Sequence, residues 1–433
     1  MKSRNWMITV GVGVLVLLAG SASAATVEER LAALEAQFEQ AASAREEVLL
    51  GRIQELEGQV ATLSQQVAAV TPVSAAALGA NAELLTRIDS LEEQVLSMED
   101  EQMNNPLKDI TLGGYGELHY NALSGSGGAK DKREIDFHRF VLMFGKEFND
   151  RVRFFSEFEL EHAIAGEGQS GEIELEQAFI DYDINDRHTA RAGVFLLPVG
   201  LLNENHEPSR FYGVERNPVE KNIIPTTWWE GGIGLYGQLS DSLDYAAYVH
   251  SGLATSADDK YAVRSGRQKV AKANASDPAA TFALNYRVPG VTVGGSVNVQ
   301  SDVTQGENGE DVASALMGEV HMDLQRGPWG LRALYAQWNL NGAGPESYGA
   351  DRQFGWYIEP SYKITDTLGV FARYNQWNNQ AGSGGADVGK EQIDIGVNWY
   401  PHEQVVLKAD YQWQINDDGK NQNGINLGVG YDF

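Results

Sequence analysis

The sequence predicts an all-β transmembrane barrel of 16 antiparallel strands, preceded by an α-helical coiled coil. After Pro106, apolar and polar residues alternate with a period of two, and short connections alternate with long ones. Before Pro106, apolar residues recur at steps of three and four, as in a coiled coil. The mean hydropathy of −0.32 excludes a bundle of apolar membrane helices. It allows a barrel, because the hydropathies of the alternating apolar and polar residues in barrel strands cancel.

The composition excludes several classes of protein. Hydrophobic residues make up 42% of the 433 residues, which is too much for a disordered chain. The absence of cysteine excludes a disulfide scaffold, thiolate metal sites and thiol catalysis. The net charge of −27 argues against nucleic acid as a partner, because phosphate binding needs a basic surface.

Residues 1–24 are predicted to be a signal peptide. Lys2 and Arg4 provide a positive start, residues 8–18 are almost wholly apolar, and residues 22–24 are the small residues that signal peptidase accepts. The alternative is an uncleaved anchor, but the apolar run is shorter than the ~20 residues of a spanning helix. We therefore expect cleavage after residue 24 and export of the chain.

Residues 25–108 are predicted to be a coiled coil with a linker near residues 71–83. This region carries 5 basic and 15 acidic side chains beside its apolar stripe. Because one helix cannot bury so narrow a stripe alone, we expect it to associate with copies of itself. The alternative is a single amphipathic helix packed on its own domain. After the linker, the stripe consists of Leu84, Ile88, Leu91, Val95 and Met98.

Residues 109–433 are predicted to form the barrel. Alternation fits a sheet with one face in lipid and the other in water, although a soluble sandwich also alternates. The predicted strands suit a tilted membrane span of roughly 9–11 residues, whereas sandwich strands are about half that length. Aromatic residues near the strand ends and the export signal favour the bacterial outer membrane. The final strand shows the pattern most clearly, with Ile425, Leu427, Val429, Tyr431 and Phe433 on one face.

The rhythm of the connections gives the strand count and requires closure. Seven short connections alternate with eight long ones, which predicts 16 strands. The backbone N–H and C=O groups of an open sheet edge find no hydrogen-bond partner in lipid, so the sheet must close. The short connections lie near residues 149–150, 185–187, 240–242, 289–290, 326–328, 365–366 and 401–403. The long ones lie near 122–132, 163–172, 198–228, 253–277, 302–311, 340–350, 379–388 and 416–422.

The third long connection, 198–228, is the predicted constriction of a water-filled lumen. Its four prolines restrict it, and its aromatic and aliphatic residues can anchor it. A rigid charged loop folded inward would select among solutes. The alternatives are an external cap or a loop that contacts other subunits. The charged residues proposed to set selectivity are Arg210, Arg216, Lys221, Glu204, Glu207 and Glu215.

Side chains alternate between the two faces of a strand, and this alternation (the strand parity) predicts which charged residues lie on the lumen wall. The parity is ambiguous over 133–147 and 171–182, where apolar residues switch face, so β-bulges are expected there. The alternative role for each wall charge is an ion pair or a solvated side chain. The predicted wall residues are Arg139, Arg153, Arg191, Arg332, Arg373, Lys408, Glu157 and Glu159.

The segment 264–272 carries four basic residues and no acidic one, so it is a candidate site for collecting anions. Binding of anionic lipopolysaccharide is the alternative, as is a solvated loop. The barrel as a whole has 26 basic and 45 acidic residues. That total says little about permeant ions, because selectivity depends on the few charges at the narrowest point. The basic residues are Arg264, Arg267, Lys269 and Lys272.

Two segments resemble the phosphate-selective porin O/P family: REIDFHRFVLMFGKEFNDRVRFFSEFELE (133–161) and ELEQAFIDYDINDRHTARAGVFLLPVGLLNE (174–204). The resemblance implies a trimeric 16-stranded barrel and, as in dicarboxylate-type channels, a periplasmic coiled coil. His138 stands where the family pattern has a second arginine beside Arg139, so fold and trimer are implied more strongly than phosphate. Gly193, Phe195 and Pro198 match the run that leads into the third loop of the family.

We therefore expect an outer-membrane porin, a passive diffusion channel for small hydrophilic solutes, chiefly anions such as phosphate or carboxylates. The expected partners are these solutes, outer-membrane lipid and lipopolysaccharide, and a homotrimer formed through barrel and coiled coil. No cofactor, metal or catalytic residue is expected, since the eight histidines form no metal-spaced motif. One alternative is a structural barrel tethered to peptidoglycan by its coiled coil, and another is a barrel enzyme at the cell surface.

Overall fold

A computed structural model describes residues 110–166, 168–306, 312–383 and 388–433. All of them belong to the second of two compact units, Asn105–Phe433. The predicted signal peptide (1–24) and the predicted coiled coil (25–108) with its linker (71–83) lie outside the described residues.

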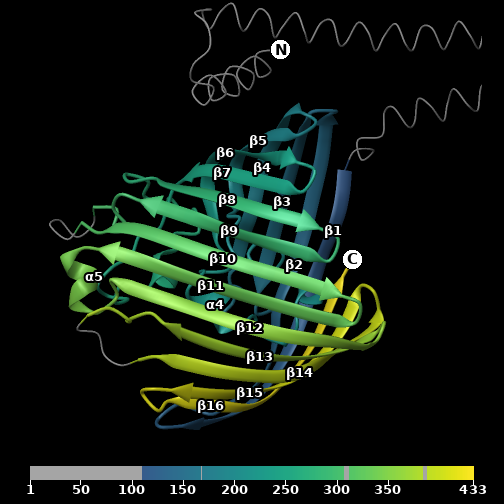
Figure 1. Cartoon of the computed structure of the whole chain (residues 1–433), viewed down its shortest axis with the longest axis vertical. Helices are drawn as coiled ribbons and strands as arrows, with labels where there is room; N and C mark the ends of the chain where they lie inside the picture. The colour runs from purple at the N-terminus through teal and green to yellow at the C-terminus, as the bar shows by residue number, and fades with distance from the viewer. Residues whose placement is uncertain (1–109, 167, 307–311, 384–387) are drawn as a thin grey trace, which may run out of the picture. The chain divides into compact units, whose positions relative to one another are not determined.

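In the part of the chain that the structure describes, sixteen β-strands form a closed barrel (Figure 1). Each strand pairs antiparallel with the next, and β1 pairs with β16, so the predicted antiparallel barrel is confirmed. The first eight strands are β1 (Ile110–Ser126), β2 (Lys132–Asn149), β3 (Val152–Glu161), β4 (Ile173–Asn185), β5 (His188–Leu196), β6 (Trp229–Ser240), β7 (Leu243–His250) and β8 (Ala279–Val288). The others are β9 (Val291–Gln300), β10 (Ser314–Arg326), β11 (Trp329–Asn341), β12 (Arg352–Thr365), β13 (Leu368–Asn378), β14 (Lys390–His402), β15 (Val405–Asn416) and β16 (Asn421–Asp432).

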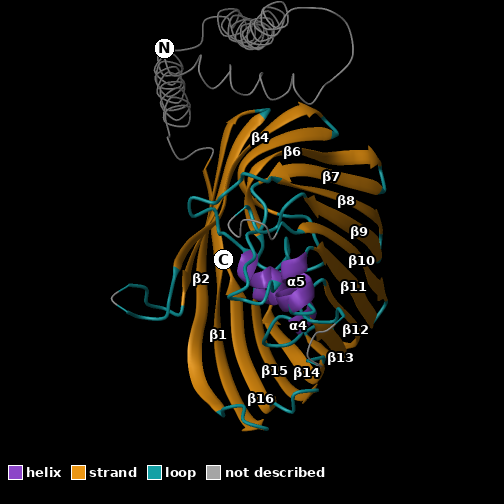
Figure 2. Cartoon of the chain, turned by 90° about the vertical axis from the view of Figure 1, so that its left-hand side faces the viewer, coloured by secondary structure: helices purple, strands orange, loops and turns teal. Residues whose placement is uncertain are grey.

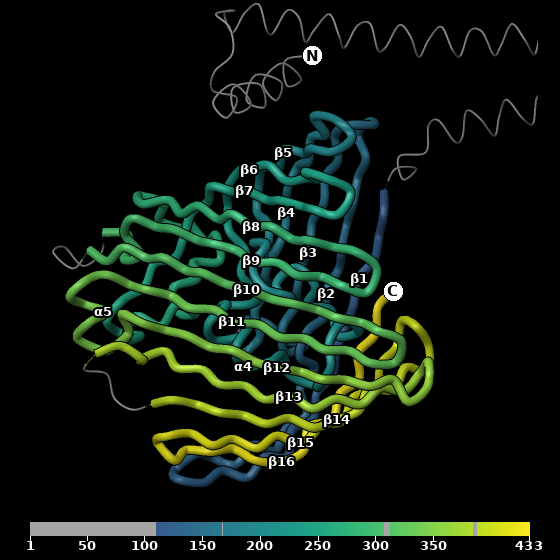
Figure 3. Tube along the Cα trace, in the orientation of Figure 1, coloured from purple at the N-terminus to yellow at the C-terminus, as the bar shows by residue number. Residues whose placement is uncertain are grey.

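Short and long connections gather at opposite ends of the barrel (Figures 1 and 3). The short ones have two residues each, as between β2 and β3, where Asn149 Oδ1 accepts hydrogen bonds from the amides of Arg151 and Val152. The long ones contain short helical turns: η1 (Pro208–Arg210), α4 (Pro218–Asn222), η2 (Val263–Gly266) and α5 (Ala343–Ser347). No helix among the described residues is long and apolar enough to cross a membrane.

Alternation separates a lipid face from a lumen face. On β9, Val297 and Val299 are 44% and 45% exposed. Ser296 and Asn298, which alternate with them along the strand, are 4% and 1% exposed. Exposed aliphatic side chains pointing outward and buried polar side chains pointing inward are the reverse of a soluble protein. The outward surface is therefore built to contact hydrocarbon.

Two β-bulges occur where the sequence parity is ambiguous. Glu117 pairs with Arg139 and Leu118 with Phe137, so His138 has no partner on β1 and both His138 and Arg139 face inward. A second bulge lies opposite Glu157 and Phe158, which pair with Gln177 and Leu175 of β4. An extra residue reverses the parity of the strand beyond it. The expected bulges in 133–147 and 171–182 are thus present.

Substitution of Val297 by arginine tests the lipid face. A charge near the midplane costs about 2–4 kcal/mol of the free energy of unfolding, because it enters hydrocarbon, whereas a charge near the interface costs about 0–1 kcal/mol. Val291, on the same strand beside the short turn to β8, provides the matched control. Denaturant unfolding from lipid vesicles measures both variants. Equal losses for Val297→Arg and Val291→Arg would contradict the assignment.

Candidate functional site

The third long connection, residues 197–228, here called L3, lies inside the ring of strands (Figure 2). Side chains of the inner wall donate hydrogen bonds to its backbone carbonyls. Arg373 Nη2 lies 2.5 Å from Tyr212 O, and Lys408 Nζ lies 2.9 Å from Gly213 O. Arg139 Nη2 of β2 lies 2.6 Å from His206 O. L3 is therefore fastened to the wall along its length.

Glycines on the inner wall allow L3 to approach the strands closely. A Cβ atom on Gly430 would lie 2.5 Å from Pro208 Cβ, and one on Gly355 would lie 2.9 Å from Val219 Cγ1. No ordinary side chain fits at such distances. The wall is thus shaped to receive the loop.

The short helix α4 gives L3 a rigid centre. Asn217 caps it, since Asn217 Oδ1 accepts a hydrogen bond from Glu220 N at 2.8 Å. Glu220 Oε2 accepts hydrogen bonds from the amides of Leu201 and Leu202, and Tyr357 Oη donates to Glu220 Oε1 at 2.7 Å. Burial raises the pKa of the Glu220 carboxyl, against these hydrogen bonds, which lower it. Glu220 joins both ends of the loop to β12.

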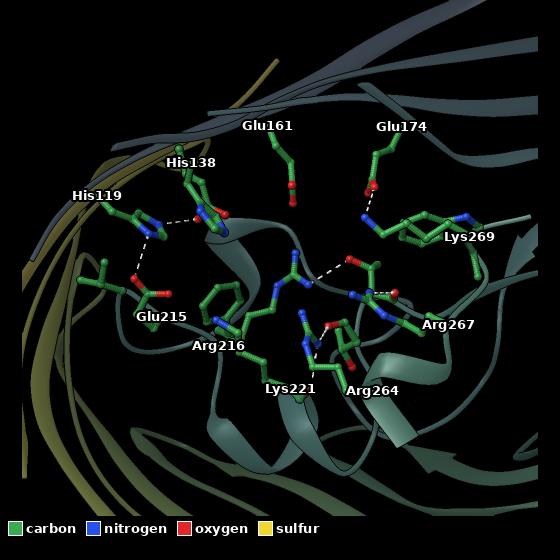
Figure 4. Close-up of a pocket in the computed structure, with 16 residues that line it drawn as sticks. His119, His138, Glu161, Glu174, Glu215, Arg216, Lys221, Arg264, Arg267 and Lys269 are labelled. Carbon is green, nitrogen blue, oxygen red and sulfur yellow. Dashed lines mark hydrogen bonds and ion pairs between the residues drawn. The ribbon is translucent and has the colours of Figure 1, made fainter. Parts of the chain in front are cut away.

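A polar cavity of about 80 Å³ lies between L3, the strands β1 to β4 and the fourth long connection, residues 251–278, here called L4 (Figure 4). Its cations come from the two loops, and most of its carboxylates come from the strands. The basic residues lining it are Arg216, Lys221, Arg264, Arg267 and Lys269. The other ionisable residues lining it are Glu117, His119, His138, Glu161, Glu174 and Glu215.

The arginines of L4 bind uncharged groups of L3 rather than carboxylates. Arg264 Nη1 donates to the carbonyls of Lys221 and Thr226 at 2.6 and 2.7 Å. Arg267 Nη1 donates to the carbonyl of Thr227 at 2.6 Å. These bonds orient the guanidinium groups and neutralise none of their charge. L4 is therefore held against L3 beside the cavity.

Burial, and after it the repulsion of neighbouring cations, lowers the pKa values of Arg264 and Lys221. Burial, together with the charges of Arg267 and Arg216, lowers the pKa of Arg264 to about 9. Burial, with Arg264 and Arg216, also lowers the pKa of Lys221 against the attraction of Glu215. Arg264 still carries its charge at neutral pH. The cluster is thus a region of positive potential that an anion would relieve.

The carboxylates facing this cluster are partly neutralised. His119 Nδ1 lies 3.3 Å from Glu215 Oε1, and its Nε2 lies 3.1 Å from Glu117 Oε2. Burial alone raises the pKa of Glu215, but His119 and Lys221 hold it well below its usual range. Lys269 Nζ contacts Glu172 and Glu174. Glu161 points into the cavity from the opposite wall (Figure 4).

The structure divides the six charged residues predicted for the third loop. Glu215, Arg216 and Lys221 line the cavity. Arg210 and Glu204 are exposed and Glu207 is half-buried, and these three are outside its lining. The selectivity role of each residue stays a prediction.

The predicted wall residues face the lumen side of the sheet, and the arginines among them are paired with carboxylates. Arg373 of β13 contacts Glu359 of β12 at 2.6 Å and Asp394 of β14 at 3.6 Å. Lys408 lies 3.6 Å from the Phe211 ring centroid as well as binding L3. These residues therefore position the loop. The remaining pairs are Arg139 with Glu117, Arg153 with Asp181 and Asp183, Arg191 with Asp181, and Arg332 with Asp323, while Glu157 and Glu159 are buried below L3.

The predicted anion-collecting segment is split between two places. Arg264, Arg267 and Lys269 line the cavity, whereas Lys272 is exposed and outside its lining. Sequence reasoning left Glu117, His119, His138, Glu161 and Glu174 out of the site. Parity along 110–120 and 151–162 places Glu117, His119 and Glu161 inward, so that signal was present, but the bulges hide His138 and Glu174.

A closed barrel with a charged loop folded into its lumen defines a porin-type channel of the outer membrane. The chain belongs to the family of phosphate-selective porins O and P, whose model matches residues 112–433. A protein of Aquifex aeolicus (strain VF5), described as uncharacterized, is 33% identical over 347 residues, which are 73% of this chain and 77% of that protein.

Solved porin structures share the fold. The outer membrane channel DcaP of Acinetobacter baumannii matches with a TM-score of 0.54 at 16% identity, covering 75% of this chain and 97% of that one. The anion-selective porin of Comamonas acidovorans matches with a TM-score of 0.54 at 11% identity, covering 75% and 99%. At these identities the likeness establishes the architecture alone.

Replacing Arg373 with methionine tests the anchoring of L3. The variant leaves Glu359 and Asp394 buried without their cation, which costs about 3–5 kcal/mol of the free energy of unfolding. We also expect noisier single-channel currents, because Tyr212 O loses its donor. The matched control is Arg187→Met, which breaks an exposed pair with Asp241 and costs about 1 kcal/mol or less.

The two readouts separate anchoring from general destabilisation. Unfolding from vesicles gives the free energies, and planar-bilayer recordings give the current noise. If Arg373→Met and Arg187→Met were alike in both, L3 would not depend on this contact.

Proposed function

We propose that the protein is a passive diffusion channel with a preference for small anions, phosphate or carboxylates. The observation that carries this is the gathering of five basic side chains from L3 and L4 around one narrow polar cavity. Charges at the narrowest point of a low-dielectric channel dominate its selectivity. The net negative charge of the barrel elsewhere matters far less.

The hydrogen-bond partners of the cations support a positive electrostatic potential on the loop side of the cavity. Of the cations that line the cavity, Lys269 has carboxylate partners, whereas Arg264 and Arg267 bind carbonyl oxygens. Arg216 Nη1 donates to the hydroxyl of Thr227 at 3.0 Å, again an uncharged partner. An oxyanion entering the cavity would meet guanidinium groups already held in place, so little ordering cost would remain.

Facing charges of opposite sign support selection by size and orientation as well. Glu161 and Glu174 face the arginines of the two loops from the strand side of the cavity, and Glu174 contacts Lys269 (Figure 4). A field across the lumen orients dipolar solutes and leaves passage dependent on diffusion, with no energy source. We further propose that the protein is a homotrimer, that a cleaved signal directs its export, and that its N-terminal coiled coil lies in the periplasm.

Reversal potentials in a salt gradient test the preference for anions. A unit charge about 8 Å from an ion is worth about 2 kcal/mol at an effective dielectric constant of about 20, before screening. We therefore expect Arg264→Gln with Arg267→Gln to lower the anion-to-cation permeability ratio several-fold. Glutamine keeps a donor for the carbonyls of L3, so the loop should remain in place.

The matched control is Arg210→Gln, which removes a charge of L3 outside the cavity lining. It should leave the permeability ratio nearly unchanged. A cation-selective wild type, or equal effects of the two variants, would refute the proposal. Inorganic phosphate, acetate and succinate as the sole anions then rank the permeant solutes.

A further inference from the structure

A second cluster of ionisable groups lies below L3, away from the cavity of Figure 4. It consists of Glu157 on β3, Glu176 on β4 and His206 on L3, each at most 2% exposed. The bulge in β4 brings Glu176 to the inner face beside Glu157, and L3 places His206 above both. One oxygen of each carboxylate and one imidazole nitrogen lie within 4.8 Å of one another.

The distances in this cluster suit shared coordination better than hydrogen bonding. His206 Nε2 lies 3.3 Å from Glu176 Oε2 and 3.6 Å from Glu157 Oε1. Charge-assisted hydrogen bonds between such groups are usually about 2.7–2.9 Å. Ligands of a tetrahedral metal, with bonds of about 2.0–2.1 Å, are separated by roughly 3.3–3.4 Å. The three atoms thus surround a space that a small cation would fill.

The hydrogen bonds around the cluster leave two of its three proposed coordinating atoms without a partner. His206 Nδ1 lies 3.0 Å from Asn203 O, an arrangement in which Nδ1–H donates and Nε2 faces the carboxylates. Metal-bound histidines are oriented in this way by a backbone carbonyl. Gln177 Nε2 donates to Glu157 Oε2 at 2.7 Å, and Tyr115 Oη donates to Glu157 Oε1 at 3.1 Å. In contrast, His206 Nε2 and Glu176 Oε2 are buried with no hydrogen-bond partner.

The charge of the surroundings favours a bound cation. Glu159 lies on the same face of β3, and its Oε2 is also buried without a hydrogen-bond partner. Arg139 is committed to Glu117 at 2.5 Å and lies 4.0 Å from Glu159. Carboxylates removed from water need a counter-charge in contact. A protonated His206 is the competitor: its carboxylate neighbours, acting against burial, raise its pKa to about 9.

We propose that Glu157, Glu176 and His206 bind a divalent transition-metal cation, best matched by Zn²⁺, which fastens L3 to the barrel wall. One imidazole and two carboxylates are donors suited to Zn²⁺, with a fourth position for water or Glu159. Ca²⁺ and Mg²⁺ prefer six or more oxygen ligands, which this site does not offer. Binding releases the proton from His206 Nε2, so affinity falls as the pH is lowered.

A second histidine cluster, Asp136, His138 and His162, provides an internal comparison. His162 Nδ1 lies 2.9 Å from both oxygens of Asp136, and His138 Nδ1 lies 3.4 Å from one of them. His162 and Asp136 thus satisfy each other at an ordinary hydrogen-bond distance, and all three residues are half-buried. The cluster is therefore the natural control.

The experiment measures the metal content of the full chain, purified in detergent, by mass spectrometry after incubation with ZnCl₂ and desalting. We expect about one equivalent of zinc in the wild type. His206→Gln and Glu176→Gln each remove a proposed ligand of the zinc ion. Loss of an outer-shell partner costs about 10–100-fold in metal affinity, so we expect each of these variants to lose more than that. His162→Gln should retain the zinc. Substitution by Co²⁺ should give the visible absorption of a four-coordinate ion in the wild type and in His162→Gln, but not in His206→Gln or Glu176→Gln.

Heat-modified gel mobility shows whether each variant has a folded barrel, and Glu176→Gln preserves the side-chain shape should His206→Gln fail to fold. A wild type with no more zinc than the two variants would overturn the proposal. So would loss of zinc in His162→Gln with retention in His206→Gln. Neither outcome bears on anion preference, which depends on the separate cavity of L3 and L4.

Discussion

In lipid, every backbone N–H and C=O group of a spanning sheet must find its partner within the protein. This chain meets the requirement by pairing β1 with β16, and the other features of the structure follow from that closure. A ring of this size encloses a lumen too wide for wall side chains to fill. The chain therefore fills it with L3, and polar side chains on the inner face of the strands become the surface against which L3 packs.

Burial of charge then decides what each inner residue does. Below and beside L3, Arg139, Arg373 and Lys408 are enclosed, so each has a carboxylate, a carbonyl or an aromatic ring in contact. Near the open cavity, Arg264 and Arg267 keep unneutralised charges, because their partners are carbonyl oxygens. The residues that anchor L3 and those that keep an unneutralised charge at the cavity are thus of similar type, and they differ in what surrounds them. The proposed metal site follows the same rule, since enclosed carboxylates require a counter-charge.

Sequence reasoning predicted the barrel, its strand number and the inward direction of the wall arginines, because alternation and turn residues act over a few positions. It could not follow parity past His138 and Glu176, where one extra residue reverses the inner and outer faces. It also treated the basic segment near Arg264 separately from the third loop. The fold of L4 brings that segment to L3, a contact between residues far apart in the chain.

The sequence by itself determined that the chain forms a closed, alternating sheet with a charged third connection, because period, strand length and turn chemistry are local properties. Only the tertiary structure decided which cations lack a carboxylate partner at the cavity and which hold L3 to the wall. It alone brought Glu157, Glu176 and His206 together. The physical reason is that electrostatic energy depends on distance and burial, and both are set by strand register, bulges and loop packing rather than by spacing along the chain.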